Sequence, residues 1–205
     1  MLDLAFVLAL SQTCAPSVAP QTLAAIAHVE SRFDPLAIGV NRGPRPAGRA
    51  RDAAEAVTIA RRLIASGANL DLGLAQINSA NLGWLGLSVE AAFDPCRNLA
   101  AAATVLQAGY RPLARTAEAR QAALRVALSR YNTGDPQRGF LNGYVGKVER
   151  AAVTLSLSTA PRLAPLLPPP VVQAERSPVP PSWDVFARST AVVAFSTDLN
   201  ARSLP

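Results

Sequence analysis

The chain has 205 residues, of which 50% are hydrophobic and 17% are charged, with a formal net charge of +6 at pH 7. This length allows one sizeable hydrophobic core and an appendage. The basic residues are scattered rather than gathered into a run with aromatics, which argues against nucleic-acid binding, and no apolar run is long enough to cross a membrane.

The first predicted helix covers about residues 3–12, with Asp3 suited to its N-terminus. The apolar run at residues 4–10 has the length of a signal-peptide core, but an acid stands where basic residues are expected before it. The candidate cleavage alanines are each followed by proline. The sequence therefore shows no clear export signal, and we expect these residues to belong to the folded domain.

A second predicted helix places an acid on its apolar face. Leu23, Ile26 and Glu30 recur at the spacing of one helical face. The Asp-Pro pair at 34–35 is expected to end the segment, so Glu30 lies in the last turn. An apolar wall and a helix C-terminus both raise the pKa of a carboxyl group. Glu30 is therefore a candidate general acid, and a helix-end glutamate that points into water is the alternative.

Further elements follow a polar loop at about residues 34–50. Hydrophobic spacing predicts helices at 52–66, 89–109, 116–131 and 137–156, and a short strand or extended segment at 70–74. In the last helix Phe140, Tyr144 and Val148 lie at four-residue spacing and are expected to face the core.

The composition changes near residue 157, because nine of the seventeen prolines lie in residues 157–205. Such a segment favours extended chain and lacks a core. We therefore expect a folded domain at 1–156 and a proline-rich, largely disordered tail at 157–205. The tail contains SWDVF, with Trp183, as a candidate binding motif.

The cysteines and the histidine give no metal site. Cys14 and Cys96 lie in no CxxC pair and His28 is the only histidine, so neither a metal nor a cofactor is expected. His28 lies on a different side of its helix from Glu30 and is expected at the surface or the rim of a site. From the residues alone, the cysteines are either two buried thiols or one disulfide.

Three short stretches punctuate the predicted helices: ESRFDP at 30–35, GLAQIN at 73–78 and YNTG at 131–134. In this order they resemble the lytic transglycosylases of the lysozyme-like superfamily. Longer blocks over about residues 10–155 resemble the VirB-type transglycosylases of type IV secretion systems: CAPSVAPQTLAAIAHVESRFDPLA, DLGLAQIN and RYNTGDPQRGFLNGYVGKVE. The SWDVF motif of the tail also resembles that group.

The resemblance implies an α+β, mostly helical, lysozyme-like domain with a small β region. It also implies cleavage of the MurNAc–GlcNAc β-1,4 bond of peptidoglycan to give 1,6-anhydroMurNAc ends, without a cofactor. Glu30 and Tyr131 fall on catalytic positions of the family. The expected substrate-binding residues are Ser31, Gln76, Asn78 and Asn132.

The resemblance further implies a periplasmic enzyme that opens the cell wall locally for a type IV secretion or conjugation system. Components of that system are the expected partners besides peptidoglycan, through the tail around Trp183. Because the periplasm is oxidising, a disulfide between Cys14 and Cys96 is expected.

Three alternative functions remain open at the level of sequence. A lysozyme proper would hydrolyse the glycan with Asp71 as the base for water, although Asp71 also suits a purely structural role. A peptidoglycan-binding scaffold with weak activity is suggested only by Ala75, which stands where the family usually has methionine. A third possibility is an interaction protein in which the tail matters most.

Overall fold

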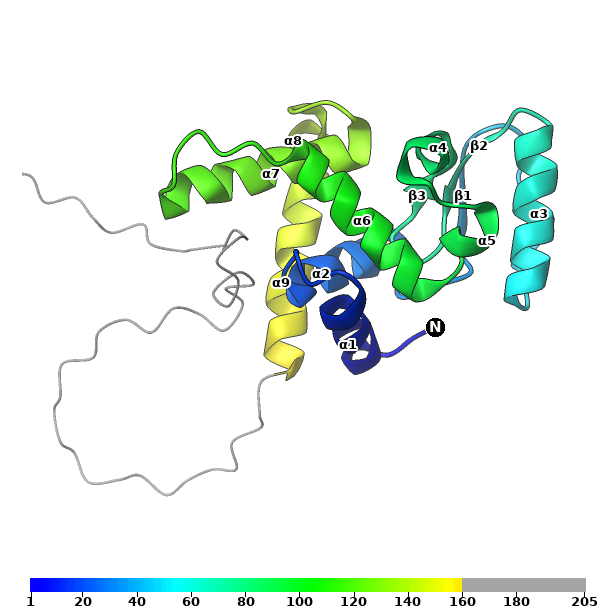
Figure 1. Cartoon of the computed structure of the whole chain (residues 1–205), viewed down its shortest axis with the longest axis horizontal. Helices are drawn as coiled ribbons and strands as arrows, with labels where there is room; N and C mark the ends of the chain where they lie inside the picture. The colour runs from blue at the N-terminus through cyan, green and yellow to red at the C-terminus, as the bar shows by residue number, and fades with distance from the viewer. Residues whose placement is uncertain (160–205) are drawn as a thin grey trace, which may run out of the picture.

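The computed structural model describes residues 1–159, with side chains described to residue 156. The SWDVF motif and all but the first residues of the expected tail lie outside the described residues. Helices and one three-stranded antiparallel sheet make up the described part of the chain, which confirms the predicted α+β, mostly helical class. Figure 1 shows the sheet and α3 at one end, with α6 running from there into the remaining helices.

The helical part surrounds the main hydrophobic core. Its elements are α1 (Leu4–Cys14), α2 (Pro20–Ser31), α6 (Pro95–Gly109), α7 (Ala117–Thr133), α8 (Arg138–Leu141) and α9 (Tyr144–Thr159). Leu23, Ile26, Leu99, Leu128 and Val148 are fully buried there, so the predicted apolar face of α2 does form the core. As expected, Asp3 caps α1: its carboxylate accepts a hydrogen bond from the Phe6 backbone at 2.8 Å.

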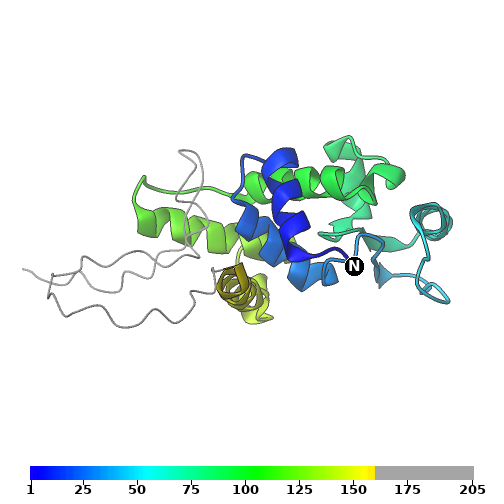
Figure 2. The ribbon, with the colours of Figure 1, turned by 90° about the horizontal axis from the view of Figure 1, so that it is seen from below.

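The sheet part has a smaller core of its own. Its elements are β1 (Ile38–Arg42), α3 (Ala53–Ala65), β2 (Asn69–Leu72), β3 (Ile77–Asn78), a 3-10 turn η1 (Ser79–Asn81), α4 (Leu82–Leu85) and α5 (Val89–Ala92). The strand order is β1-β2-β3, and Leu72 lies opposite both Ile38 and Ile77. Ala60 and Leu70 are fully buried between α3 and the sheet. In two views at right angles, α3 and α7 lie at opposite ends of the domain (Figures 1 and 2).

Three expectations about the elements are corrected. The loop predicted at 34–50 contains β1, whose Gly39, Asn41 and Arg42 are weak strand formers, so the strand depends on pairing with β2. The helix predicted at 89–109 is two helices, because Pro95 begins a new one that Asp94 caps.

The helix predicted at 137–156 also divides. Gly143, at φ 77°, separates α8 from α9, and α9 continues to Thr159. Phe140 therefore does not share a face with Tyr144 and Val148. It is 38% exposed and lies 5.8 Å from the Arg125 guanidinium instead of in the core.

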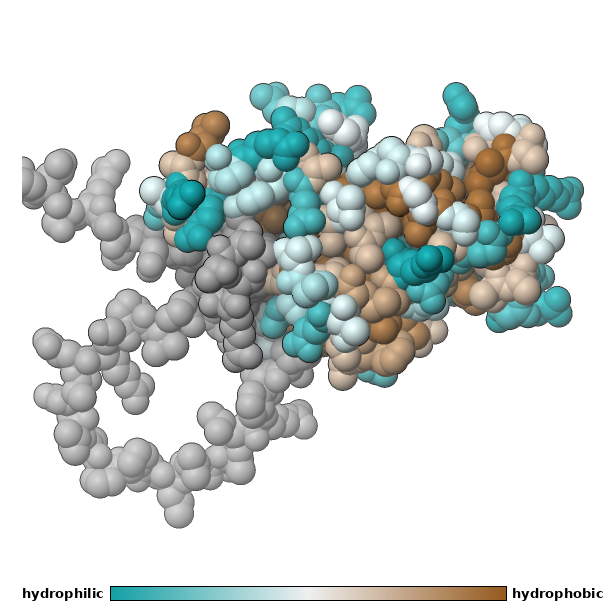
Figure 3. Space-filling view, in the orientation of Figure 1, coloured by the Kyte–Doolittle hydropathy of each residue, from teal (hydrophilic) through white to brown (hydrophobic). Residues whose placement is uncertain are grey.

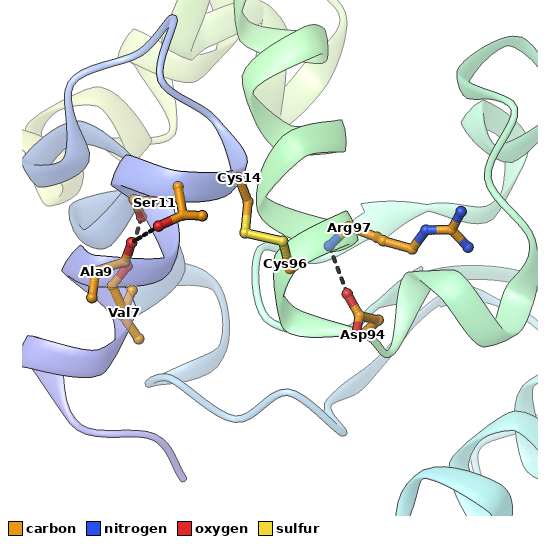
Figure 4. Close-up of a disulfide and its surroundings, with 8 residues drawn as sticks. Val7, Ala9, Ser11, Cys14, Asp94, Cys96 and Arg97 are labelled. Atoms are coloured by element: carbon orange, nitrogen blue, oxygen red, sulfur yellow. Dashed lines mark hydrogen bonds between the residues drawn. A yellow bond between two sulfur atoms is a disulfide. The ribbon is translucent and has the colours of Figure 1, made fainter.

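A disulfide between Cys14 and Cys96 joins the end of α1 to the first turn of α6, with the Cα atoms 5.4 Å apart (Figure 4). The two cysteines are 82 residues apart in the sequence. The bridge therefore closes most of the first half of the chain into one loop.

On the face seen in Figure 3, polar residues are most frequent toward the two ends of the domain. In Figure 3 hydrophilic residues gather over α3 and along α7, whereas the face around α1 is more apolar. Within residues 1–159, no helix combines the length and the apolar character needed to span a membrane.

Candidate active site

A cleft of about 620 Å³ lies between the sheet and the C-terminal end of α7. Five of the six predicted catalytic and substrate-binding residues line it, and they come from three stretches that are far apart in the sequence: Glu30, Gln76, Asn78, Tyr131 and Asn132. Most of the other lining side chains are polar, among them Asn41, Asp71 and Asn81. A polar cleft of this size suits a ligand rich in hydroxyl and amide groups.

Glu30 reaches the cleft because of the way in which α2 ends. The helix stops at Ser31, before the Asp-Pro pair, because Arg32 and Phe33 take left-handed conformations at φ 56° and 64°. The Arg32 N–H closes the helix onto the carbonyl of His28 at 3.1 Å. Two successive non-glycine residues in this region store backbone strain, which is common beside functional sites.

The surroundings of Glu30 raise the pKa of its carboxyl group. Burial raises the pKa of Glu30 from its usual value of 4.5 to about 7, against the opposing effect of a hydrogen bond from Tyr144. The negative charge of Asp71 raises this pKa further. An acid with a pKa near neutrality can both donate and accept a proton at physiological pH.

Tyr144 is the site residue that sequence reasoning missed. Its buried hydroxyl donates to Oε1 of Glu30 at 2.5 Å from the first turn of α9. Burial and then the charge of Glu30 raise the pKa of Tyr144 well above its usual value, so the hydroxyl remains a proton donor. The four-residue spacing with Val148 correctly marked Tyr144 as inward-facing, but nothing in the sequence indicated that its hydroxyl meets Glu30.

Tyr131 contacts the backbone of the 73–76 loop. Its hydroxyl donates to the backbone carbonyl of Ala75 at 2.7 Å. Burial and the nearby charges of Glu30 and Asp71 raise its pKa well above the usual value. Tyr131 thus connects α7 to the 73–76 loop close to Glu30. The residue that hydrogen-bonds to Glu30 itself is Tyr144.

The 73–76 loop is held from both sides. The Ser31 hydroxyl donates to the Leu74 carbonyl at 2.6 Å. On the other side the fully buried Asn98 accepts from the Ala75 N–H at 2.7 Å and donates to the Leu72 carbonyl at 2.9 Å. Asn98 also donates to the Ala92 carbonyl at 2.7 Å, so one amide joins β2, the loop and α5.

Gly73 makes this close packing possible. It has φ 74°, and a Cβ there would lie 2.2 Å from the Ala92 carbonyl oxygen and 2.6 Å from Nδ2 of Asn98. Position 73 therefore needs glycine both for its backbone angle and for space.

Gln76 is fixed at the floor of the cleft. It has φ 52°, and its amide donates to the carbonyls of Ala37 at 3.1 Å and Gly73 at 2.9 Å. Both donors are therefore committed to the backbone. Its carbonyl oxygen lies beside Gly39, where a Cβ would come within 2.6 Å of it.

Asp71 belongs to a network of side-chain amides. Its two oxygens accept hydrogen bonds from Asn41 and Asn78, each at 2.7 Å. Asn78 also accepts from the Ala80 N–H at 3.0 Å, at the start of η1. The structural role expected for Asp71 therefore depends on side-chain partners on β1 and β3, the strands on either side of β2, rather than on neighbouring backbone groups.

The remaining predicted residues lie as follows. Asn132 accepts from the Asn142 amide at 2.8 Å on the exposed side of the cleft. Ser31 lines a separate hollow of about 470 Å³, into which Glu30 also faces. His28 packs against Phe33, with ring centroids 5.3 Å apart, and burial and then Arg32 lower its pKa.

Ala75 does not open the cleft. It is fully buried and is not among the described residues that line the cavity. The position at which the family usually has methionine therefore lies in the core and not on the wall of the cleft.

Comparisons with known proteins agree with this arrangement. The family model described as "Transglycosylase SLT domain" matches residues 8–153. The chain is 43% identical to "Protein virB1" of Agrobacterium fabrum over 176 residues, covering 86% of this chain and 68% of the relative. It is 41% identical to "Type IV secretion system protein virB1" of Brucella abortus over 157 residues, covering 75% and 66%. No solved structure gave a significant match.

Proposed function

The chain belongs to the transglycosylase SLT domain family and is a lytic transglycosylase; on that premise we propose that Glu30 is its catalytic acid and base and that peptidoglycan is its substrate. The observation that carries this proposal is the Glu30 carboxyl group, which has a pKa of about 7 in a polar cleft. The other lining residues suit N-acetyl and hydroxyl groups, which need both donors and acceptors.

In the first step Glu30 protonates the glycosidic oxygen between MurNAc and GlcNAc. The bond from C1 of MurNAc to that oxygen breaks, and the sugar's own N-acetyl group stabilises the positive charge at C1. Glu30 is then a carboxylate, and the Tyr144 hydroxyl stabilises it through the 2.5 Å hydrogen bond.

In the second step Glu30 takes the proton of the C6 hydroxyl of the same MurNAc. The freed C6 oxygen bonds to C1 and closes a 1,6-anhydro ring. Glu30 is protonated again, so one carboxyl group serves both steps and no water is consumed. A pKa near neutrality suits this alternation better than the pKa of an ordinary glutamate.

The direct test is digestion of purified peptidoglycan by the wild type and by Glu30→Gln. Mass spectrometry of the products should show anhydro ends for the wild type. The Gln variant keeps the shape but not the titrating proton, so its rate should fall by about 10²-fold or more. A Gln variant that digests like the wild type would remove Glu30 from this role.

A lysozyme mechanism is the second candidate, since Asp71 lies in the same cleft as Glu30. Against it, both Asp71 oxygens already accept amide hydrogen bonds, so a water molecule would have to compete with Asn41 and Asn78 for them. Reducing ends instead of anhydro ends in the digest would favour hydrolysis.

We also propose that the enzyme acts in the periplasm and opens the wall for a type IV secretion system. The support is the similarity to the Brucella abortus protein named "Type IV secretion system protein virB1". The Cys14–Cys96 disulfide suits an oxidising compartment. Deletion of the gene in its own host should reduce secretion or conjugation, and Glu30→Gln should fail to restore it.

The tail is proposed to bind partner components, with the catalytic domain able to act without it. A chain ending after residue 159 should digest peptidoglycan at the wild-type rate. The same chain should restore secretion less well than the full-length protein if Trp183 and its neighbours bind the machinery. A truncated domain that loses its fold would place the boundary elsewhere.

A further inference from the structure

Trp84 lies on the surface although its helix is well anchored. It is 56% exposed, whereas tryptophan is mostly buried in folded proteins. Its neighbours Leu82 and Leu85 on α4 pack against the hydrophobic core. The short helix therefore buries its leucines and holds the largest side chain of the segment outside.

The indole is fixed at the rim of the cleft. Its Nε1–H donates to Oδ1 of Asn81 at 3.1 Å, and Asn81 lines the catalytic cleft. On the outer side Ala80 is exposed, and a Cβ added to Gly83 would meet no atom within 4 Å. Small neighbours thus leave the surface beside the ring open.

We propose that Trp84 forms a further subsite of the cleft, at which a sugar ring of the glycan strand stacks on the indole. This inference rests on the proposed function, because it takes the substrate to be a glycan polymer. Such a polymer extends on both sides of the bond that is cut. Its further sugar rings therefore lie against the surface of the protein next to the cleft. Trp84 lies on that surface, because its hydrogen-bond partner Asn81 lines the same cleft as Glu30.

The chemistry of the two partners fits. One face of a pyranose ring is made of C–H groups, and the face of an aromatic ring carries partial negative charge that attracts them. The hydrogen bond to Asn81 fixes the ring before the sugar arrives, so little side-chain freedom is lost on binding.

A protein partner is the less fitting occupant. Protein interfaces bury several hundred square ångströms on each side around a cluster of anchors. In the segment 79–92, Trp84 is the one large hydrophobic residue that is exposed, while Leu82, Leu85 and Leu87 are at least partly buried. A single exposed aromatic side chain matches one sugar ring.

Fluorescence gives the first test. The full-length chain has two tryptophans, so Trp183→Phe leaves Trp84 as the single reporter. The probes are N-acetylglucosamine oligomers of two, four and six units. We expect a saturable change in Trp84 emission that grows stronger with oligomer length. A flat titration with all three oligomers, in an enzyme that still digests peptidoglycan, overturns the subsite.

Kinetics on polymeric peptidoglycan give the second test. Trp84→Ala should raise KM by about three- to tenfold with kcat nearly unchanged, the effect of losing one aromatic contact. Trp84→Phe should keep most of the affinity. The matched control is Phe6→Ala, which removes an aromatic that is 48% exposed on α1, where none of the described residues lines the cleft. An equal KM effect of Phe6→Ala, or no effect of Trp84→Ala, overturns the proposal.

The two proposals can fail separately. If Glu30→Gln remains active while Trp84 still responds to the oligomers, the catalytic assignment fails and the subsite stands. If Glu30→Gln is inactive and Trp84 gives no response, the subsite fails and the catalytic assignment stands.

Discussion

Tyr144 and Glu30 lie 114 residues apart in the sequence, yet the hydroxyl of one donates to the carboxyl group of the other at 2.5 Å. The contact joins the first turn of α9 to the last turn of α2. Because the hydrogen bond favours the charged form of Glu30, it lowers a pKa that burial raises. Tyr144 therefore adjusts the strength of the acid as well as its position.

Tyr144→Phe should lower kcat by about tenfold or more, since the carboxylate formed after proton donation loses its hydrogen bond. The same change should raise the pKa of Glu30, so the loss of activity toward alkaline pH should begin at a higher pH than in the wild type. The measurement is the pH dependence of kcat on soluble glycan strands.

Tyr131→Phe is the matched control for that measurement. It removes a hydroxyl from the same cleft, but one that bonds to the Ala75 carbonyl and not to Glu30. It should cost about 1 kcal/mol of stability and some activity, with a smaller displacement of the pH profile. Identical profiles for the two variants would argue against a specific effect of Tyr144 on Glu30.

Asp71→Asn should displace the pH profile in the opposite direction. The charge of Asp71 raises the pKa of Glu30, so its removal lowers that pKa. The acid then loses its proton at a lower pH, and activity should begin to fall at a more acidic pH than in the wild type. An unchanged profile would show that the charge of Asp71 does not reach Glu30. Anhydro ends should persist in the products if Asp71 is not the base.

Glu30→Gln should stabilise the protein at alkaline pH while abolishing activity. The folded-state pKa of about 7 lies above the usual 4.5, so stability is fully present below pH 4.5 and falls as the pH rises through 7. Glutamine does not ionise and avoids this loss. Relative to wild type, the variant should gain about 3 kcal/mol between pH 4 and pH 8. Urea unfolding of both proteins at pH 4 and at pH 8 measures this gain. If the variant and the wild type differ in unfolding free energy by the same amount at both pH values, the raised pKa of Glu30 is contradicted.

Replacement of Cys14 and Cys96 by serine should lower the free energy of unfolding by about 4 kcal/mol, the value for a loop of this length. Denaturant unfolding of the wild type with and without reductant provides the comparison. The serine variant should be insensitive to reductant, and a wild type that is equally insensitive would contradict the bridge.

Local patterns were sufficient to predict much of the fold. The apolar face of α2, the Asp3 cap and the ends of α3 follow from spacing and capping chemistry, which act over a few residues. The β1 strand did not follow, because its residues form a strand only through pairing with β2, which lies some thirty residues later.

The features of the site also fall into those that local sequence predicts and those that depend on contacts between distant segments. The position of Glu30 at a helix end against an apolar wall can be read locally, whereas the contacts of Tyr144 and Asn98 connect distant segments. Asn98 stands in the Ala-rich segment as an ordinary polar residue. Only the folded chain shows that its amide makes three buried hydrogen bonds, to the backbone of Ala75 in the loop, Leu72 on β2 and Ala92 on α5.

Gly73 has a consequence for attempts to redesign this enzyme. In a saturation library, position 73 should accept none of the other nineteen amino acids, because the first carbon of any side chain already meets the Ala92 carbonyl and Asn98. Gly48, which has open space around it, should accept many replacements. Libraries that seek a new glycan preference should therefore vary the residues that line the cleft or lie next to it, such as Asn81 and Trp84, and leave Gly73 unchanged.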